Sequence, residues 1–179
     1  MLAASVAAGL LGSGGVVWAS SRAAFSGATA NAGNTWSAGS VELSDNTVGS
    51  TVFNATNLVS GAIDSSCVAV SYGGSVDADV RLYLSPANLT GTLAPYVDLR
   101  VEAGPGNCAA FAANSTVYTG TLAGFAGSAG GYATGRGSWS AAGHSGASRA
   151  YRFSWALRDD NDAQGRTVSA KFTWEAQNR

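Results

Sequence analysis

The chain has 179 residues, of which only 12% are charged, with Lys+Arg 10 against Asp+Glu 11. The resulting net charge of -1 provides no basic field, which excludes electrostatic binding to nucleic acid or to an anionic membrane. The same near-neutral balance gives little repulsion between copies of the chain, so self-association meets little electrostatic resistance.

Residues 1–23 have the pattern of a secretory signal peptide. Residues 2–18 are uncharged and rich in Ala, Gly, Leu and Val, and small residues suited to a signal peptidase follow them. The run is shorter than the roughly 20 apolar residues of a transmembrane helix, and its glycines disfavour a buried helix. We therefore expect cleavage after Ala19 or after Ala23, giving a secreted or cell-surface protein with no stable membrane anchor.

Two motifs follow the expected cleavage region. Residues 21–26 read SRAAFS, which places an aromatic side chain near the cut, and residues 34–43 read NTWSAGSVEL and lead into a predicted strand. A turn at residues 57–61, NLVSG, precedes two further predicted strands in residues 67–82. This arrangement resembles the TasA/camelysin family of secreted Gram-positive surface proteins, whose signal peptides are cut by a SipW-type peptidase.

The resemblance implies a jelly-roll topology, cleavage just before Ala24, and assembly through an N-terminal donor strand. In such assembly an extended segment completes the sheet of a neighbouring subunit through main-chain hydrogen bonds. The candidate segment is residues 24–38, with Ala24 at its start and with Phe25 and Trp36 as the side chains expected to enter pockets of the acceptor. The alternative is a disordered mature N-terminus, because Ala, Gly and Asn are poor strand formers.

Residues 39–179 are expected to form one domain with an all-β fold, a two-sheet antiparallel sandwich. Apolar side chains alternate with polar ones in residues 80–84, 97–102, 151–158 and 168–175, which is the period of half-buried strands. The turn-forming residues 159–166 predict that the last two strands pair as a hairpin, with Trp155 and Trp174 in the core. Residues 124–148 lack periodicity and are expected to be irregular with at most one short strand, and no segment has a helical stripe.

Cys67 and Cys108 are the two cysteines, and both belong to the part expected to be exported. Since an oxidising exterior preserves disulfides, we expect them to pair. The alternative is two buried free thiols.

The sequence contains few residues that could form a catalytic or metal site. Camelysin was named as a metallopeptidase, but a zinc peptidase needs three protein ligands, and His144 is the only histidine and has no second histidine at a zinc-site spacing. The sequence therefore predicts no enzyme activity and no cofactor. A weak calcium candidate remains at Asp159, Asp160 and Asp162, for which a solvated turn is the favoured interpretation.

The main rival function is carbohydrate binding by an extracellular β-sandwich module. It requires the loop aromatics Trp36, Tyr96, Tyr132 and Trp139 to form one exposed strip on which a sugar can stack. The preferred prediction is a non-enzymatic structural protein, a cell-surface or biofilm-matrix fibre subunit whose partners are other copies of itself and, during export, a SipW-type signal peptidase.

Overall fold

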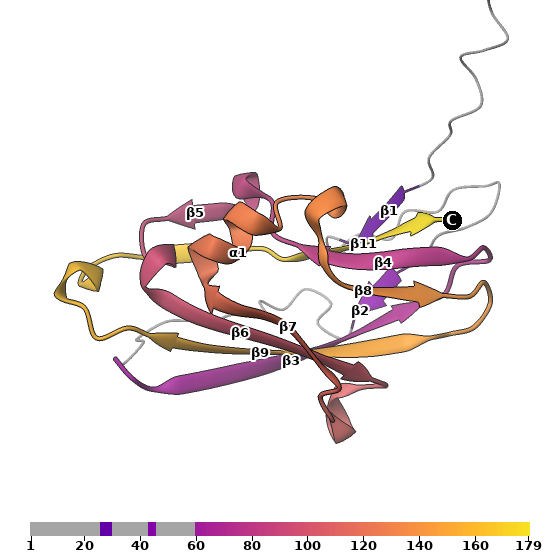
Figure 1. Cartoon of the computed structure of the whole chain (residues 1–179), viewed down its shortest axis with the longest axis horizontal. Coiled ribbons are helices and arrows are strands. Elements are labelled where there is room, and N and C mark those ends of the chain that lie inside the picture. The colour runs from indigo at the N-terminus through magenta and orange to yellow at the C-terminus, as the bar shows by residue number, and fades with distance from the viewer. Residues whose placement is uncertain (1–25, 30–42, 46–59) are drawn as a thin grey trace, which may run out of the picture.

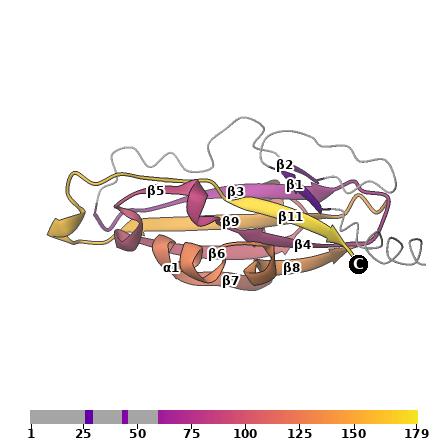
Figure 2. The same cartoon turned by 90° about the horizontal axis from the view of Figure 1, so that it is seen from above.

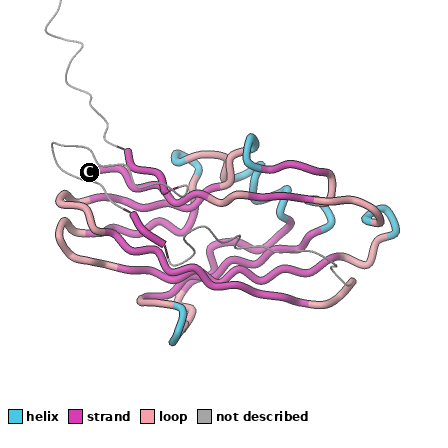
Figure 3. Tube along the Cα trace, turned by 180° about the vertical axis from the view of Figure 1, so that it is seen from behind, coloured by secondary structure: helices cyan, strands magenta, loops and turns pink. Residues whose placement is uncertain are grey.

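The protein is described by a computed structural model that covers residues 26–29, 43–45 and 60–179, and it consists of two antiparallel sheets packed face to face (Figure 1; Figure 3). One sheet has four strands in the order β1-β11-β4-β8, and the other has five in the order β2-β3-β9-β6-β7. The predicted all-β antiparallel sandwich is confirmed. The jelly-roll topology implied by the resemblance stays a prediction.

The four-stranded sheet contains β1 (Ser26–Thr29), β11 (Thr173–Asn178), β4 (Ala78–Tyr83) and β8 (Arg136–Ala141). The five-stranded sheet contains β2 (Leu43–Asp45), β3 (Ile63–Tyr72), β9 (Ser148–Leu157), β6 (Val97–Pro105) and β7 (Ser115–Thr121). A short ladder of β5 (Leu89–Gly91) with β10 (Val168–Ala170) continues the β4–β11 pair, because β5 follows β4 and β10 precedes β11 in the chain.

The core lies between the sheets and is built by the predicted alternation. Val80 and Leu82 on one side of β4, and Leu84 just after it, are fully buried. Aromatic rings join the two sheets across the core, with Phe153 of β9 lying 4.9 Å from Phe172 between ring centroids. Trp155 and Trp174 are 5% and 3% exposed, which confirms both as core residues.

The predicted hairpin of residues 151–158 with residues 168–175 is wrong. β9 lies between β3 and β6 in the five-stranded sheet, whereas β11 lies between β1 and β4 in the other sheet. Both strands point aromatic side chains into the same core, but from opposite sheets. Residues 158–167 connect the two sheets. The second strand is also interrupted at residues 171–172, which separate β10 from β11.

Residues 124–148 are more regular than expected, because they contain helical turns as well as the one short strand that the sequence allows for. They contain most of α1 (Leu122–Ser128), a 3-10 turn at Tyr132–Thr134 and strand β8. The Thr121 side chain caps α1 by accepting a hydrogen bond from the Gly124 N–H at 3.0 Å. Leu122, Phe125 and Ala126 bury one face of the helix against the core, and the segment joins β7 of one sheet to β8 of the other (Figure 1).

None of the helices in the described part of the chain is long and apolar enough to cross a membrane.

Candidate assembly edge and neighbouring sites

Part of the predicted donor segment forms an edge strand. Ser26–Thr29 make up β1 and pair antiparallel with β11, with Ser26 opposite Gln177 and Thr29 opposite Trp174. β1 lies at the same end of the sandwich as the C-terminus (Figure 1). The predicted site residues Ala24, Phe25 and Trp36 lie outside the described residues.

The strand that receives β1 is firmly held on its core side. Trp174 and Ala176 are buried, and the Trp174 ring packs 5.5 Å from the ring of Tyr151 in the opposite sheet. Tyr151 is itself fully buried and donates a hydrogen bond from its hydroxyl to the Gly137 carbonyl at 3.0 Å. Burial raises the pKa of this phenol well above its usual value. The strand that pairs with β1 is therefore packed firmly against the core.

The outer side of β11 is polar and hydrogen-bonded to β4. Tyr83 donates to the Glu175 carboxylate at 2.9 Å, and Gln177 donates to the other oxygen of that carboxylate at 2.8 Å. Burial, and then the hydrogen bond to Glu175, raise the pKa of Tyr83 to about 12. These contacts fix β11 against β4 and leave its other edge to β1.

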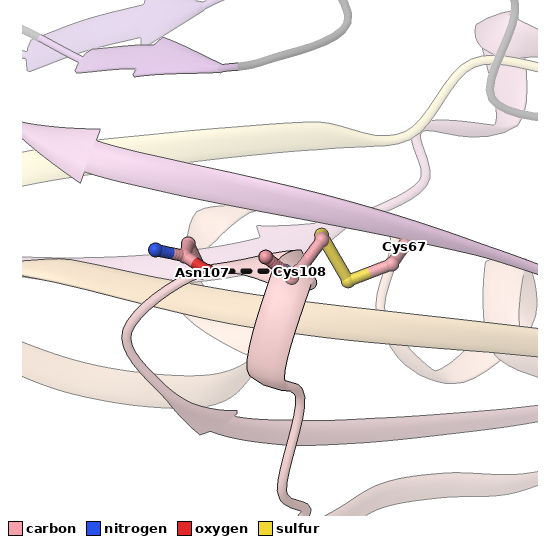
Figure 4. Close-up of a disulfide and its surroundings, with 4 residues drawn as sticks. Cys67, Asn107 and Cys108 are labelled. Atoms are coloured by element: carbon pink, nitrogen blue, oxygen red, sulfur yellow. Dashed lines mark hydrogen bonds between the residues drawn. A yellow bond between two sulfur atoms is a disulfide. The ribbon is translucent and has the colours of Figure 1, made fainter.

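The predicted disulfide between Cys67 and Cys108 is present, joining residues 41 positions apart (Figure 4). Cys67 lies in β3, and Cys108 begins the 3-10 turn η3 (Cys108–Ala110), which projects from the five-stranded sheet on the side away from the core (Figure 1). Asn107 caps this turn by accepting from the Ala109 N–H at 3.0 Å (Figure 4). The disulfide thus anchors the β6–β7 connection to β3.

A charged cluster lies beside this anchor on the same outer face. Glu102 of β6 accepts hydrogen bonds from Arg100 and from Arg152 of β9, each at 2.8 Å, and the Arg152 guanidinium lies 4.7 Å from the ring centre of Phe111. The hydrogen bond from Arg152 is the main reason why the pKa of Glu102 is lowered, since burial acts in the opposite direction. The two guanidinium groups balance the negative charge of the carboxylate and favour its ionised form.

Residues of the acidic turn form hydrogen bonds with one another. The Asp160 carboxylate accepts from the Asp162 N–H at 2.9 Å and caps the 3-10 turn η5 (Asn161–Ala163), while Arg166 donates to the Asp162 carbonyl. Within residues 26–29, 43–45 and 60–179, no group of three or more His, Cys, Asp or Glu side chains is placed to hold a metal ion. His144 is exposed on the β8–β9 turn, where its main-chain N–H donates to the Gly74 carbonyl at 2.8 Å.

A cleft of about 660 Å³ is lined by residues of the acidic turn. This turn between β9 and β10 lies at the end of the sandwich opposite to the C-terminus (Figure 2). Its apolar lining comes from Leu93, Leu157, Ala163 and Val168, and its polar lining from Ser60, Arg158, Asp159, Asp160, Asn161, Gln164, Arg166 and Thr167. No sequence pattern predicted this cleft, because its walls come from three separate stretches of the chain, at Ser60, at Leu93 and over residues 157–168.

The described aromatics of the proposed carbohydrate platform do not form one strip. Trp139 lies opposite the buried Val80 in the β4–β8 ladder, whereas Tyr132 packs over Arg81, the next residue of β4, at 4.9 Å. Since adjacent strand residues point to opposite faces, the two rings lie on opposite sides of the sheet. Tyr96 ends the 3-10 turn η2 (Ala94–Tyr96), with the Arg166 guanidinium 5.2 Å from its ring centre. Trp36 lies outside the described residues.

Neither the comparison with protein-family models nor the search of curated proteins finds a match to this chain.

Proposed function

We propose that the chain is a secreted, non-enzymatic structural protein, a TasA-like cell-surface or biofilm-matrix fibre subunit that assembles through an N-terminal donor strand. The observation that carries this proposal is the antiparallel register of β1 on β11. It identifies a sheet edge of the folded domain with which the N-terminal segment is complementary.

In strand addition, the affinity comes from main-chain hydrogen bonds. The same hydrogen bonds can be made by a strand of the same chain or by the identical strand of another copy. β1 makes a four-residue ladder at the margin of its sheet, with β11 as its partner. An identical segment from a neighbouring subunit finds the same register on the same edge. Exchange of β1 between copies would convert a self-completed monomer into a chain of subunits without a new fold.

The remaining features fit an extracellular structural role. The Cys67–Cys108 disulfide belongs with an oxidising compartment, and a net charge of -1 leaves copies free to approach one another. On this proposal the SipW-type peptidase exposes the donor by cutting before Ala24.

Three forms of the protein test the proposal. The chain starting at Ala24 should form filaments visible by electron microscopy, whereas a chain lacking residues 24–36 should stay monomeric in light scattering with its sandwich folded. A chain with a bulky N-terminal tag should also fail to assemble, because the donor could not enter a neighbour. Monomer in all three forms would reject the proposal.

A further inference from the structure

The cleft lined by Ser60, Leu93 and residues 157–168 has the size of a ligand site. Its volume of about 660 Å³ falls within the roughly 300–1,000 Å³ that is usual for small-molecule sites. Donor-strand pairing does not use it, because β1 pairs with residues 174–177 of β11 and none of these residues lines the cleft. The cleft is therefore a candidate binding site separate from the assembly edge.

The apolar side of the cleft is formed before any ligand arrives. Leu93 and Ala163 are buried, with 7% and 6% of their surface exposed. Leu157 and Val168 are partly buried and pack against the core. The Thr167 carbonyl accepts from the Leu93 N–H at 3.1 Å, which ties two of the stretches that line the cleft to one another. A ligand would therefore meet a fixed apolar surface and would not have to order it.

Tyr96 holds two arginines of the cleft in place. The Arg158 main-chain N–H donates to the Tyr96 carbonyl at 2.9 Å, and the Arg166 guanidinium lies 5.2 Å from the centre of the Tyr96 ring. The Arg158 side chain is also fixed by Asp98, whose carboxylate accepts from Nε at 2.8 Å. Since a guanidinium group has five N–H donors, both arginines keep donors for a ligand after these contacts.

The charges that line the cleft cancel one another. The lining has two positive and two negative side chains, which are Arg158, Arg166, Asp159 and Asp160. Its formal net charge is therefore zero, which favours neither a phosphate group nor a cation. Asn161 and Gln164 add amide groups, which both donate and accept hydrogen bonds. A hydroxyl group also donates and accepts, so this set of side chains suits a ligand that has many hydroxyl groups and no net charge.

A sugar ring matches both sides of the cleft, because its hydroxyl groups lie around its edge and its faces carry C–H groups. We infer that the cleft is a binding site for neutral carbohydrate. The ring faces pack against Leu93, Leu157 and Val168, and the hydroxyl groups form hydrogen bonds with the charged and amide side chains. This goes beyond the proposed function, since a fibre subunit with such a site also holds a glycan.

This site differs from the aromatic platform that the sequence suggested. The platform needed exposed rings in one strip, whereas the cleft offers aliphatic side chains beside hydrogen-bonding groups. Of the described loop aromatics, Tyr96 contributes to the cleft by positioning Arg158 and Arg166.

Fluorescence polarisation with labelled oligosaccharides tests the inference on the chain beginning at Ala24. The probes are maltohexaose, cellohexaose and chitohexaose, which are neutral, and hexaguluronate, which is anionic. At least one neutral hexamer should bind saturably, and hexaguluronate should not. Absence of binding by all the neutral hexamers, or equal binding of hexaguluronate, would overturn the inference.

Competition with unlabelled sugars distinguishes the two sources of such a ligand. A monosaccharide that competes as well as the hexamer identifies free sugar as the ligand, and competition by the hexamer alone identifies a segment of a polysaccharide. Either result supports the inference.

A matched pair of variants places the binding in the cleft. Asp159→Ala should weaken binding about tenfold, because a ligand hydroxyl loses a charged acceptor. Asp162 is exposed in the same turn but does not line the cleft, so Asp162→Ala should change the affinity less than about twofold. An unchanged affinity in Asp159→Ala, or an equal loss in both folded variants, would overturn the inference. Filament formation by Asp159→Ala should match that of the parent, so failure of this inference leaves the proposed function standing.

Discussion

Glu102 and Arg152 lie directly opposite one another on β6 and β9 and form an ion pair with an N–O distance of 2.8 Å. The Glu102 side chain is only 12% exposed, whereas that of Arg152 is 42% exposed. The pair lies next to the disulfide, because Arg152 is also opposite Cys67 on the other side of β9. The outer face of the five-stranded sheet thus combines a covalent anchor with a charge cluster.

Because of this pair, the free energy of unfolding should depend on pH in the acid range. The hydrogen bond from Arg152 holds the pKa of Glu102 below its usual value of 4.5. A lowered pKa in the folded state contributes stability above the unfolded pKa, and that contribution is lost as the pH falls through the folded value. Glu102→Gln should therefore lower the free energy of unfolding by about 1 kcal/mol at pH 7, and by progressively less below pH 4.5.

Urea denaturation at several pH values measures this difference. Asp98→Asn is the matched control, because the Asp98–Arg158 pair is about half exposed on both sides and should be worth less than about 0.5 kcal/mol. An equal loss for Glu102→Gln at pH 3 and at pH 7 would contradict the assignment.

Tyr83 should produce a corresponding effect at alkaline pH. Its pKa is raised from 10.0 to about 12 by burial and by the hydrogen bond to Glu175. A raised pKa contributes stability that is complete below the unfolded value and is lost as the pH rises through the folded value. The free energy of unfolding should therefore decline between pH 10 and pH 12, and Tyr83→Phe should make that decline shallower. The variant should also lose about 1 kcal/mol at pH 7 because Glu175 loses a donor. An unchanged alkaline decline in Tyr83→Phe would show that Tyr83 is not its source.

Removal of the disulfide should destabilise the fold without abolishing the sandwich. Closing a loop between residues 41 apart stabilises by about 3 to 4 kcal/mol in the chain-entropy model. We expect this loss in the double variant Cys67→Ser with Cys108→Ser, measured by urea unfolding against the oxidised protein. The five-stranded sheet should persist in circular dichroism, since Val68 and Val70 remain buried on its core side. A double variant as stable as the oxidised protein would rule out this role for the disulfide.

Alternation in the sequence predicted which side chains of β4, β6 and β9 enter the core, but it did not predict which strands pair. The alternation predicts that Phe153 and Trp174 both face the core. This pattern is the same whether the two strands are neighbours in one sheet or lie in opposite sheets. Periodicity also failed for α1, which has seven residues and is capped by Thr121. A helix of two turns buries too few positions to produce a recognisable stripe.

The candidate site was predictable only in part. The family resemblance implied an extended segment at Ser26–Thr29, although its residues are poor strand formers, and its register on Trp174 and Gln177 depends on tertiary structure. The cleft brings Ser60 and Leu93 together with residues 157–168, which are far from both in the chain, and no local pattern indicates this meeting.

Filament formation by the chain beginning at Ala24, compared with its Gly27→Pro, Ala28→Pro variant, is the most direct measurement of donor-strand assembly. Two consecutive prolines remove adjacent main-chain donors, so they disrupt pairing with β11 whichever of the two points toward it. The Gly27→Ala, Ala28→Ser variant keeps both donors and serves as the control. We predict filaments by electron microscopy for the parent and the control, and soluble folded monomer for the proline variant. Filaments of equal abundance in the proline variant, or monomer in the parent, would contradict the account.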